Sequence, residues 1–229
     1  MEIPNSPQMA GKKLAPSAIV SYFDQYVIGQ EDAKKILAVV VYSHYRKMGK
    51  ANQGPVEIAK SNVLLIGPTG TGKTLLCETL ARAIGVPFVT ANATSLAQSK
   101  YVNEEIEAVL LRLLDRADGD MDKAQRGIVF IDEIDKLKAA DSQHTTSGER
   151  VQHALLKIME GAPVRLGNGQ NIDTTNILFI CAGAFVGLET ITANTHAFGF
   201  ISIADADNQK ILDRLNSRVK PTDLFTFGL

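Results

Sequence analysis

Residues 67–74 of the chain read Gly-Pro-Thr-Gly-Thr-Gly-Lys-Thr, which satisfies the pattern G-x-x-x-x-G-K-[ST] in full. The apolar run Val63–Ile66 precedes this stretch, and an amphipathic run from Lys73 to Ile84 follows it. Glycines allow backbone N–H groups to point at an anion, and a helix N-terminus adds partial positive charge. The stretch therefore predicts a phosphate-binding loop between a strand and a helix.

This loop predicts binding of ATP together with Mg²⁺. Lys73 is expected to neutralise oxygens of the β- and γ-phosphates, which gives it a catalytic role, and the Thr74 hydroxyl is expected to ligate Mg²⁺. The nucleotide is expected to contact the whole loop and the residue after it: Gly67, Pro68, Thr69, Gly70, Thr71, Gly72, Lys73, Thr74 and Leu75.

A second apolar run, Ile128–Ile131, is followed directly by Asp132 and Glu133. Ligands of open α/β sheets bind at the carboxyl ends of the strands, so both carboxylates are expected beside the phosphate loop. Asp132 would hold Mg²⁺, directly or through water, and Glu133 would be the general base that polarises the attacking water. The sequence lacks the Asn-Lys-x-Asp signature of guanine recognition. A carboxylate pair also suits water better than a metabolite as the acceptor, so the pattern favours an ATPase over a GTPase or a small-molecule kinase.

Short apolar runs alternate with amphipathic helical patterns through most of the chain. Strands are expected at Asn62–Ile66, Phe88–Thr90, Ile128–Ile131 and Asn176–Cys181, and helices at Lys73–Ile84, Glu104–Arg116, Ser147–Glu160 and Asp205–Arg218. This alternation predicts an α/β fold whose mainly parallel sheet is covered by helices on both faces, a three-layer α/β/α sandwich. Pro163–Asp173 is expected to form a hairpin. Ser17–Lys47 predicts two helices joined by a turn at Gly29, after a loose lead-in over residues 1–16.

The composition excludes several classes of protein. The 229 residues carry 24 Lys and Arg against 25 Asp and Glu, so the net charge of −1 gives no electrostatic reason to expect nucleic acid or an anionic membrane as the partner. Two separated cysteines, Cys77 and Cys181, support neither a disulfide scaffold nor a zinc module. No apolar run reaches the roughly 18 residues of a membrane span, and the first residues lack a secretory pattern. A cytoplasmic protein with reduced thiols is expected.

With these motifs in place, the sequence resembles the AAA+ ATPases, and within them the ClpX-like protein unfoldases. The resemblance runs from about Ala15 to Leu229. It rests on separate segments that match the family's adenine motif, phosphate loop, Walker B strand, following helix, fourth core strand and one further motif: Tyr26–Gln30, Lys60–Thr74, Gly127–Lys136, Ser147–Gly161, Ile172–Cys181 and Asp223–Leu229.

The resemblance implies a P-loop NTPase of the AAA+ type, working as a hexameric ring that threads protein substrates to a ClpP-type peptidase. It implies that Val27 and Ile28 line the adenine pocket. It also implies that Tyr101 and Val102 grip the substrate, and that Phe198-Gly199-Phe200 forms the docking tripeptide for the peptidase.

The sequence departs from the family pattern in its gripping loop, where Lys100 and Asn103 replace two glycines. Residues 17–60 are expected to form the N-terminal helical segment and residues 61–229 the P-loop core. We expect that core to stop before the family's arginine finger and small helical domain. An arginine finger accelerates related reactions by about 10³–10⁵-fold, so slow turnover is expected from this chain alone. The alternative reading is a nucleotide-dependent binding or assembly module that binds ATP without threading substrate.

Overall fold

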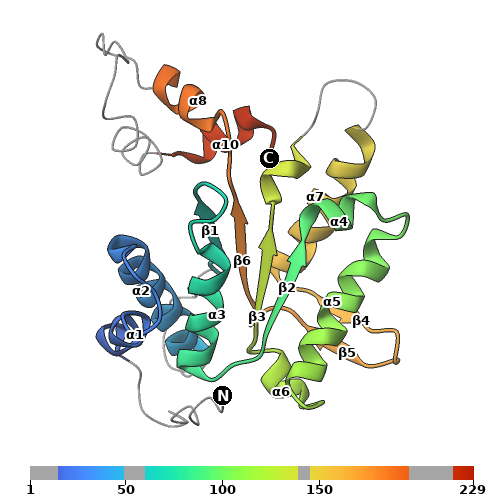
Figure 1. Ribbon diagram of the computed structural model, residues 1–229. Coiled ribbons are helices and arrows are strands. Elements are labelled where there is room, and N and C mark those ends of the chain that lie inside the picture. Colours follow the sequence, from blue (N-terminus) through green and yellow to red (C-terminus); the bar gives the residue numbers. More distant parts are fainter. Residues whose placement is uncertain (1–14, 49–59, 139–144, 196–218) are drawn as a thin grey trace, which may run out of the picture.

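The computed structural model describes residues 15–48, 60–138, 145–195 and 219–229. Its centre is a four-stranded parallel sheet in the order β1-β6-β3-β2. The strands are β1 (Val63–Ile66), β6 (Leu178–Gly183), β3 (Ile128–Asp132) and β2 (Phe88–Asn92). All four carboxyl ends therefore lie at one edge of the sheet, at the top of Figure 1. The predicted α/β fold with a parallel sheet is confirmed.

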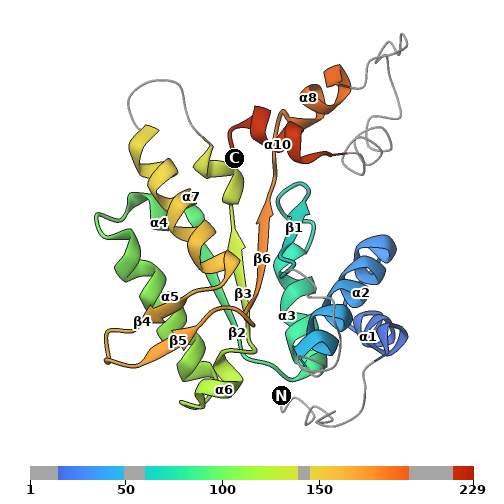
Figure 2. The same cartoon turned by 180° about the vertical axis from the view of Figure 1, so that it is seen from behind.

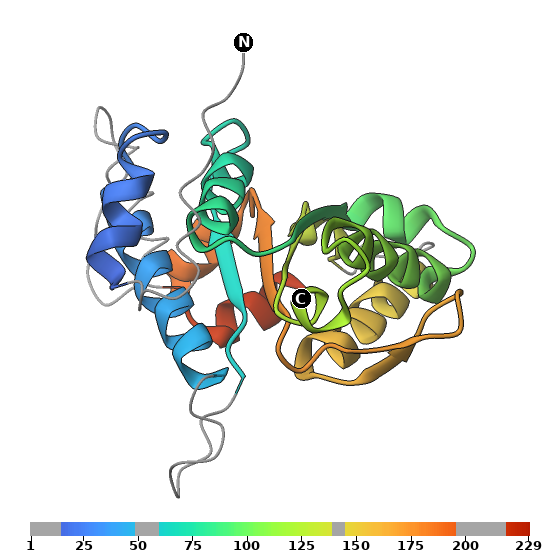
Figure 3. The ribbon, with the colours of Figure 1, turned by 90° about the horizontal axis from the view of Figure 1, so that it is seen from below.

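Helices cover both faces of the sheet, as the views from behind and from below show (Figures 2 and 3). On one face lie α1 (Pro16–Phe23), α2 (Glu31–Met48) and α3 (Lys73–Ile84); on the other lie α4 (Ala93–Gln98), α5 (Val102–Arg116) and α7 (Thr145–Glu160). The N-terminal helices share one apolar core with α3, in which Phe23 and Leu37 pack with Leu80. This arrangement is the expected three-layer sandwich with an N-terminal helical segment.

The central strands explain why two separate cores form. Alternate residues of a strand point to opposite faces. In β3, Ile128 and Phe130 belong to the core under α1–α3, whereas Val129 and Ile131 belong to the core under α4, α5 and α7. Strands buried on both faces read as continuous apolar runs, which is the pattern seen in the sequence.

The two cysteines follow the same division, because Cys77 lies in the core under α1–α3 and Cys181 in the opposite core.

The predicted hairpin is present as β4 (Pro163–Arg165) paired antiparallel with β5 (Asn171–Asp173). The predicted helices after the phosphate loop and in the middle of the chain are confirmed within two residues. The expected helix at Asp205–Arg218 lies outside the described residues. Five short elements were not expected: α4, α6 (Met121–Ala124), η1 (Ile134–Leu137), α8 (Leu188–Thr195) and α10 (Pro221–Phe227). Among the helices described, none has the length and apolar character needed to cross a membrane.

Candidate functional site

The phosphate loop connects the end of β1 to the start of α3 at the carboxyl edge of the sheet. Gly70 and Gly72 both have a φ of 84°, a left-handed conformation that costs glycine little. Gly72 is the N-cap of α3, and within the described part of the chain no side chain caps this helix. The first backbone N–H groups of a 12-residue helix are thus left for an anion. The Gly67 N–H donates to the Gly183 carbonyl over 3.1 Å, which ties the loop to the end of β6.

The Lys73 ammonium bonds to the loop itself. Its Nζ donates to the Gly67 carbonyl over 2.6 Å and to the Pro68 carbonyl over 2.9 Å. The Thr71 hydroxyl donates to the same Pro68 carbonyl over 2.8 Å. Thr74 is exposed in the first turn of α3. The Lys73 ammonium therefore lies against the loop, and the exposed Thr74 stands at the start of α3, an arrangement that fits a phosphate chain and its Mg²⁺.

Asp132 and Glu133 stand at the end of β3, as the sequence predicts. Asp132 is the last residue of the strand and lies opposite Asn92 of β2. Its Oδ1 accepts the Glu133 N–H over 2.8 Å. Burial, together with the negative charge of Asp132, raises the pKa of the Cys77 thiol to about 12. Asp132 and the phosphate loop thus stand at the same edge of the sheet, at the end of β3 and after β1, with β6 between the two strands.

Glu133 is held by two side chains that sequence reasoning missed. Its Oε2 accepts hydrogen bonds from Asn92 Nδ2 and from Thr94 Oγ1, each over 2.9 Å. These bonds, with that of Asn92 the largest influence, lower the pKa of the Glu133 carboxyl. Glu133 has a φ of 57°, a left-handed conformation that is uncommon outside glycine. The strained turn directs the side chain toward the end of β2.

The turn between α1 and α2 reaches the phosphate loop from the side. Ile28 is 99% exposed, whereas its neighbour Val27 is 8% exposed and belongs to the core. Gln30 donates from Nε2 to the Thr71 carbonyl over 3.4 Å. The turn is fixed by the buried Lys34, whose ammonium pairs with Asp24 and Glu31. Of the two predicted adenine contacts, only Ile28 presents its side chain to the surface. Gln30 was not predicted as a site residue.

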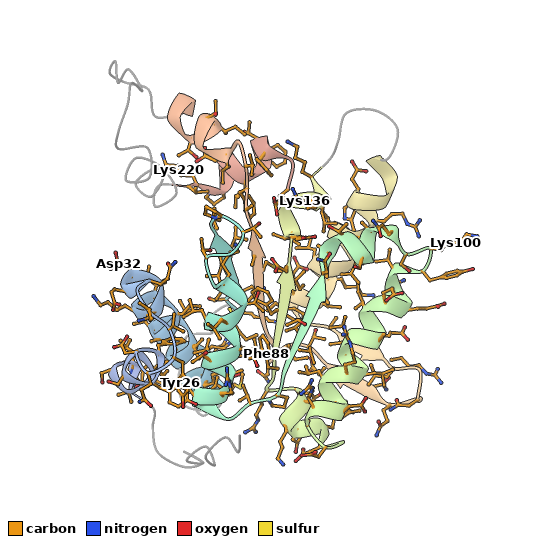
Figure 4. All side chains as sticks on the ribbon, in the orientation of Figure 1. Tyr26, Asp32, Phe88, Lys100, Lys136 and Lys220 are labelled. Carbon is orange, nitrogen blue, oxygen red and sulfur yellow. The ribbon has the colours of Figure 1, made fainter. Side chains whose placement is uncertain are left out.

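The predicted gripping loop lies on the far side of the sheet from α1–α3 (Figures 1 and 3). Tyr101 is 61% exposed, but Val102 is 6% exposed and packs as the first residue of α5. Lys100 points away from the sheet (Figure 4). A groove of about 400 Å³ separates this loop from Arg150 and His153 of α7. Tyr101 is therefore available to a partner and Val102 is not. The predicted docking tripeptide Phe198-Gly199-Phe200 lies outside the described residues.

Comparison with known proteins gives one family and several relatives. The AAA domain family (Cdc48 subfamily) matches residues 58–222. The protein of Treponema denticola called "ATP-dependent Clp protease ATP-binding subunit ClpX" is 47% identical over 93% of this chain and 56% of its own length. Its namesake in Porphyromonas gingivalis is 46% identical over 93% of the chain and 56% of its own length. The protein of Methylococcus capsulatus called "ATP-dependent Clp protease ATP-binding subunit ClpX 3" is 44% identical over 97% of this chain and 58% of its own length. The chain spans somewhat more than half the length of these relatives.

Proposed function

Because the chain belongs to the AAA domain family, we propose that it binds ATP with Mg²⁺ and hydrolyses the nucleotide as the ATP-binding part of a ClpX-like protein unfoldase. The observation that carries the proposal is the arrangement at one edge of the sheet. The phosphate loop follows β1, Asp132 ends β3 and Glu133 comes directly after it, with only β6 between the two strands. Ligands of such sheets bind at this edge.

Binding uses groups that the loop already presents. The backbone N–H groups at the start of α3 receive phosphate oxygens, and Lys73 exchanges its two carbonyl acceptors for β- and γ-phosphate oxygens. Thr74 and Asp132 would hold Mg²⁺, which when bound would neutralise charge that develops on the phosphates. Ile28, whose side chain is almost entirely exposed, offers an apolar surface to the base.

Glu133 carries the hydrolytic step. Its carboxylate accepts a proton from a water molecule whose oxygen bonds to the γ-phosphorus, while the bond from that phosphorus to the β–γ bridging oxygen breaks. The lowered pKa keeps this carboxylate ionised, as a base requires. Asn92 and Thr94 both bond to Oε2, which leaves Oε1 for the water.

The wider proposal is that hydrolysis drives the threading of protein substrates, in a hexamer, to a ClpP-type peptidase in the cytoplasm. It is supported by the names of the relatives and by the exposed Tyr101, which we propose as the residue that contacts substrate. The tripeptide Phe198-Gly199-Phe200 is proposed as the contact with the peptidase. A second candidate is a module that binds ATP without threading. The buried Val102 favours it, because only one of the two expected gripping side chains is free.

The nucleotide reaction is tested with two substitutions and one control. Lys73→Ala is expected to weaken ATP binding at least about 100-fold, since it removes charged hydrogen bonds worth about 1.5–3 kcal/mol each. Glu133→Gln is expected to bind ATP normally and to lose turnover. Glu104→Gln, an exposed acid in the first turn of α5, is the matched control and should change neither. Fluorescent-nucleotide titration and phosphate release measure the two properties. Turnover in Glu133→Gln would remove Glu133 from the role of base.

Threading is tested by ATP-dependent loss of a fluorescent substrate in the presence of a ClpP-type peptidase. Tyr101→Ala should stop this loss while ATP hydrolysis continues. Phe225→Ala removes another exposed aromatic side chain and serves as the control. Equal loss of substrate in both variants would remove Tyr101 from the gripping role, whereas no loss in the wild-type chain would favour the module that binds without threading.

A further inference from the structure

Asp135 is a buried carboxylate close to the site. It takes no part in the nucleotide binding or in the hydrolysis proposed for this chain. It lies in η1 and is 5% exposed. Its Oδ2 accepts the Phe185 N–H over 3.2 Å. Its Oδ1 is buried and has no hydrogen-bond partner in the described part of the chain. The ammonium of Lys136 lies 4.0 Å from Oδ2. A buried carboxylate oxygen without a partner is costly, so simple stabilisation does not account for this residue.

The hydrogen bond from Phe185 joins two strained turns. Glu133 has a φ of 57° and Phe185 a φ of 54°, and both are left-handed without being glycine. One follows β3 and the other follows β6, which are neighbouring strands. Such conformations persist only where the surroundings hold them. The Asp135 carboxylate thus fixes the turn that carries Glu133 against the turn after β6.

The contact extends to the phosphate loop through Gly183. A Cβ atom on Gly183 would lie 2.5 Å from Asp135 Oδ1 and 2.7 Å from the Phe185 ring, so only glycine admits this packing. The Gly183 carbonyl in turn accepts the Gly67 N–H. Figure 4 shows Lys136, the neighbour of Asp135, at this carboxyl edge of the sheet. Because β6 lies between β1 and β3, the turn after it lies between the phosphate loop and Glu133.

We infer that Asp135 is a positioning residue for ATP hydrolysis, which holds the Glu133 turn and the turn after β6 in a single arrangement around the γ-phosphate. This inference rests on the proposed hydrolysis at Glu133. Asp135 does not contact the nucleotide in this arrangement. The groups that bind phosphate belong to the loop and to α3, so Asp135 affects the rate of the chemical step and leaves affinity unchanged.

The test compares two substitutions of Asp135. Asp135→Ala removes the acceptor and is expected to lower kcat for ATP at least about 10-fold, with KM and the nucleotide Kd within about twofold, because misplacing a reacting group by 1 Å costs up to about 100-fold. Asp135→Asn keeps an oxygen for the Phe185 N–H and is expected to restore kcat to within about threefold. Hydrogen exchange should show faster exchange of the Phe185 amide in the alanine variant only.

Asp223→Ala is the matched control. Asp223 is 1% exposed and accepts the Lys220 N–H over 2.9 Å, and its Oδ1 has no hydrogen-bond partner among the residues that the structure describes. It lies in α10 and not beside Glu133. The Asp223→Ala variant should have a lower melting temperature than wild type and, below that temperature, an unchanged kcat. If Asp135→Ala does not fold, Gly183→Ala perturbs the same contact from β6 and should lower kcat in the same way.

The outcomes separate this inference from the proposed function. An unchanged kcat in Asp135→Ala, or in Gly183→Ala where that replaces it, overturns the inference and leaves the function standing if Glu133→Gln is inactive. An equal loss of kcat and nucleotide affinity also overturns it, because Asp135 would then contribute to binding. Turnover in Glu133→Gln overturns the proposed function itself.

Discussion

Thr94→Val removes one of the two hydrogen bonds that hold Glu133 and changes little else, because valine has the shape of threonine. Each bond to this half-exposed carboxylate stabilises its position by about 1 kcal/mol. Since 1.36 kcal/mol corresponds to a factor of ten, losing one bond lowers the population of the oriented base about fivefold, and losing both lowers it about 30-fold. We therefore expect kcat to fall about fivefold in Thr94→Val and about 30-fold in the double variant with Asn92→Ala, with nucleotide affinity unchanged.

The assay is single-turnover hydrolysis of ATP at saturating protein, with nucleotide affinity measured separately. Thr94→Ser restores the hydroxyl and should recover most of the rate. Thr226→Val removes a hydroxyl that bonds within α10 and controls for the substitution itself. Asn92 also caps α4 through the Ser95 N–H, so the double variant is compared with wild type well below its melting temperature. An unimpaired rate in the double variant, with Glu133→Gln inactive, would refute the idea that these bonds orient the base.

Three further outcomes are expected. Thr174→Val should lower the free energy of unfolding by about 2–3 kcal/mol in urea titrations, because the buried hydroxyl bonds to backbone groups of α7 and of the loop before β4. Burial lowers the pKa of Lys60 to about 8, so the unfolded chain binds more protons between about pH 8 and pH 10.5. Wild type should therefore gain unfolding free energy relative to Lys60→Gln as the pH rises through that interval, and a flat difference would contradict the pKa shift. Ile28→Asp should weaken ATP binding about tenfold without lowering stability. Ile36→Asp, at another exposed isoleucine, should change neither the affinity for ATP nor the stability.

Contiguous patterns account for what the sequence could predict. The phosphate loop, the strand before it and the carboxylates at the end of β3 are each encoded within a few neighbouring residues. The burial of Val102 was also readable, because Val102, Ile106 and Val109 form one apolar stripe of a helix. The gripping role of Val102 was implied by the family resemblance alone, and its burial leaves Tyr101 as the exposed member of the pair.

The partners of Glu133 could not be predicted in the same way. Asn92 and Thr94 lie about forty residues earlier in the chain, and they reach Glu133 only because β2 pairs with β3. No local pattern specifies which strands become neighbours. The role of Asp135 could not be predicted for the same reason, because the N–H group that it accepts belongs to Phe185 in the turn after β6. The missed helices α4 and α6 are short, and their starts depend on single capping residues, Asn92 and Asp120.

Because the two thiols lie on opposite faces of the sheet, the alkylation rate of each one reports how often the helices on its own face separate from the sheet. Burial raises the pKa of both Cys77 and Cys181 to about 12, so neither reacts with an alkylating reagent until its own layer opens. The labelling rate of Cys77 therefore reports the separation of α1–α3 from the sheet, and the labelling rate of Cys181 reports the separation of the opposite helices. Because Cys77 shares α3 with the phosphate loop, saturating ATP should slow its labelling more than that of Cys181, so each layer's motion can be followed without an added label.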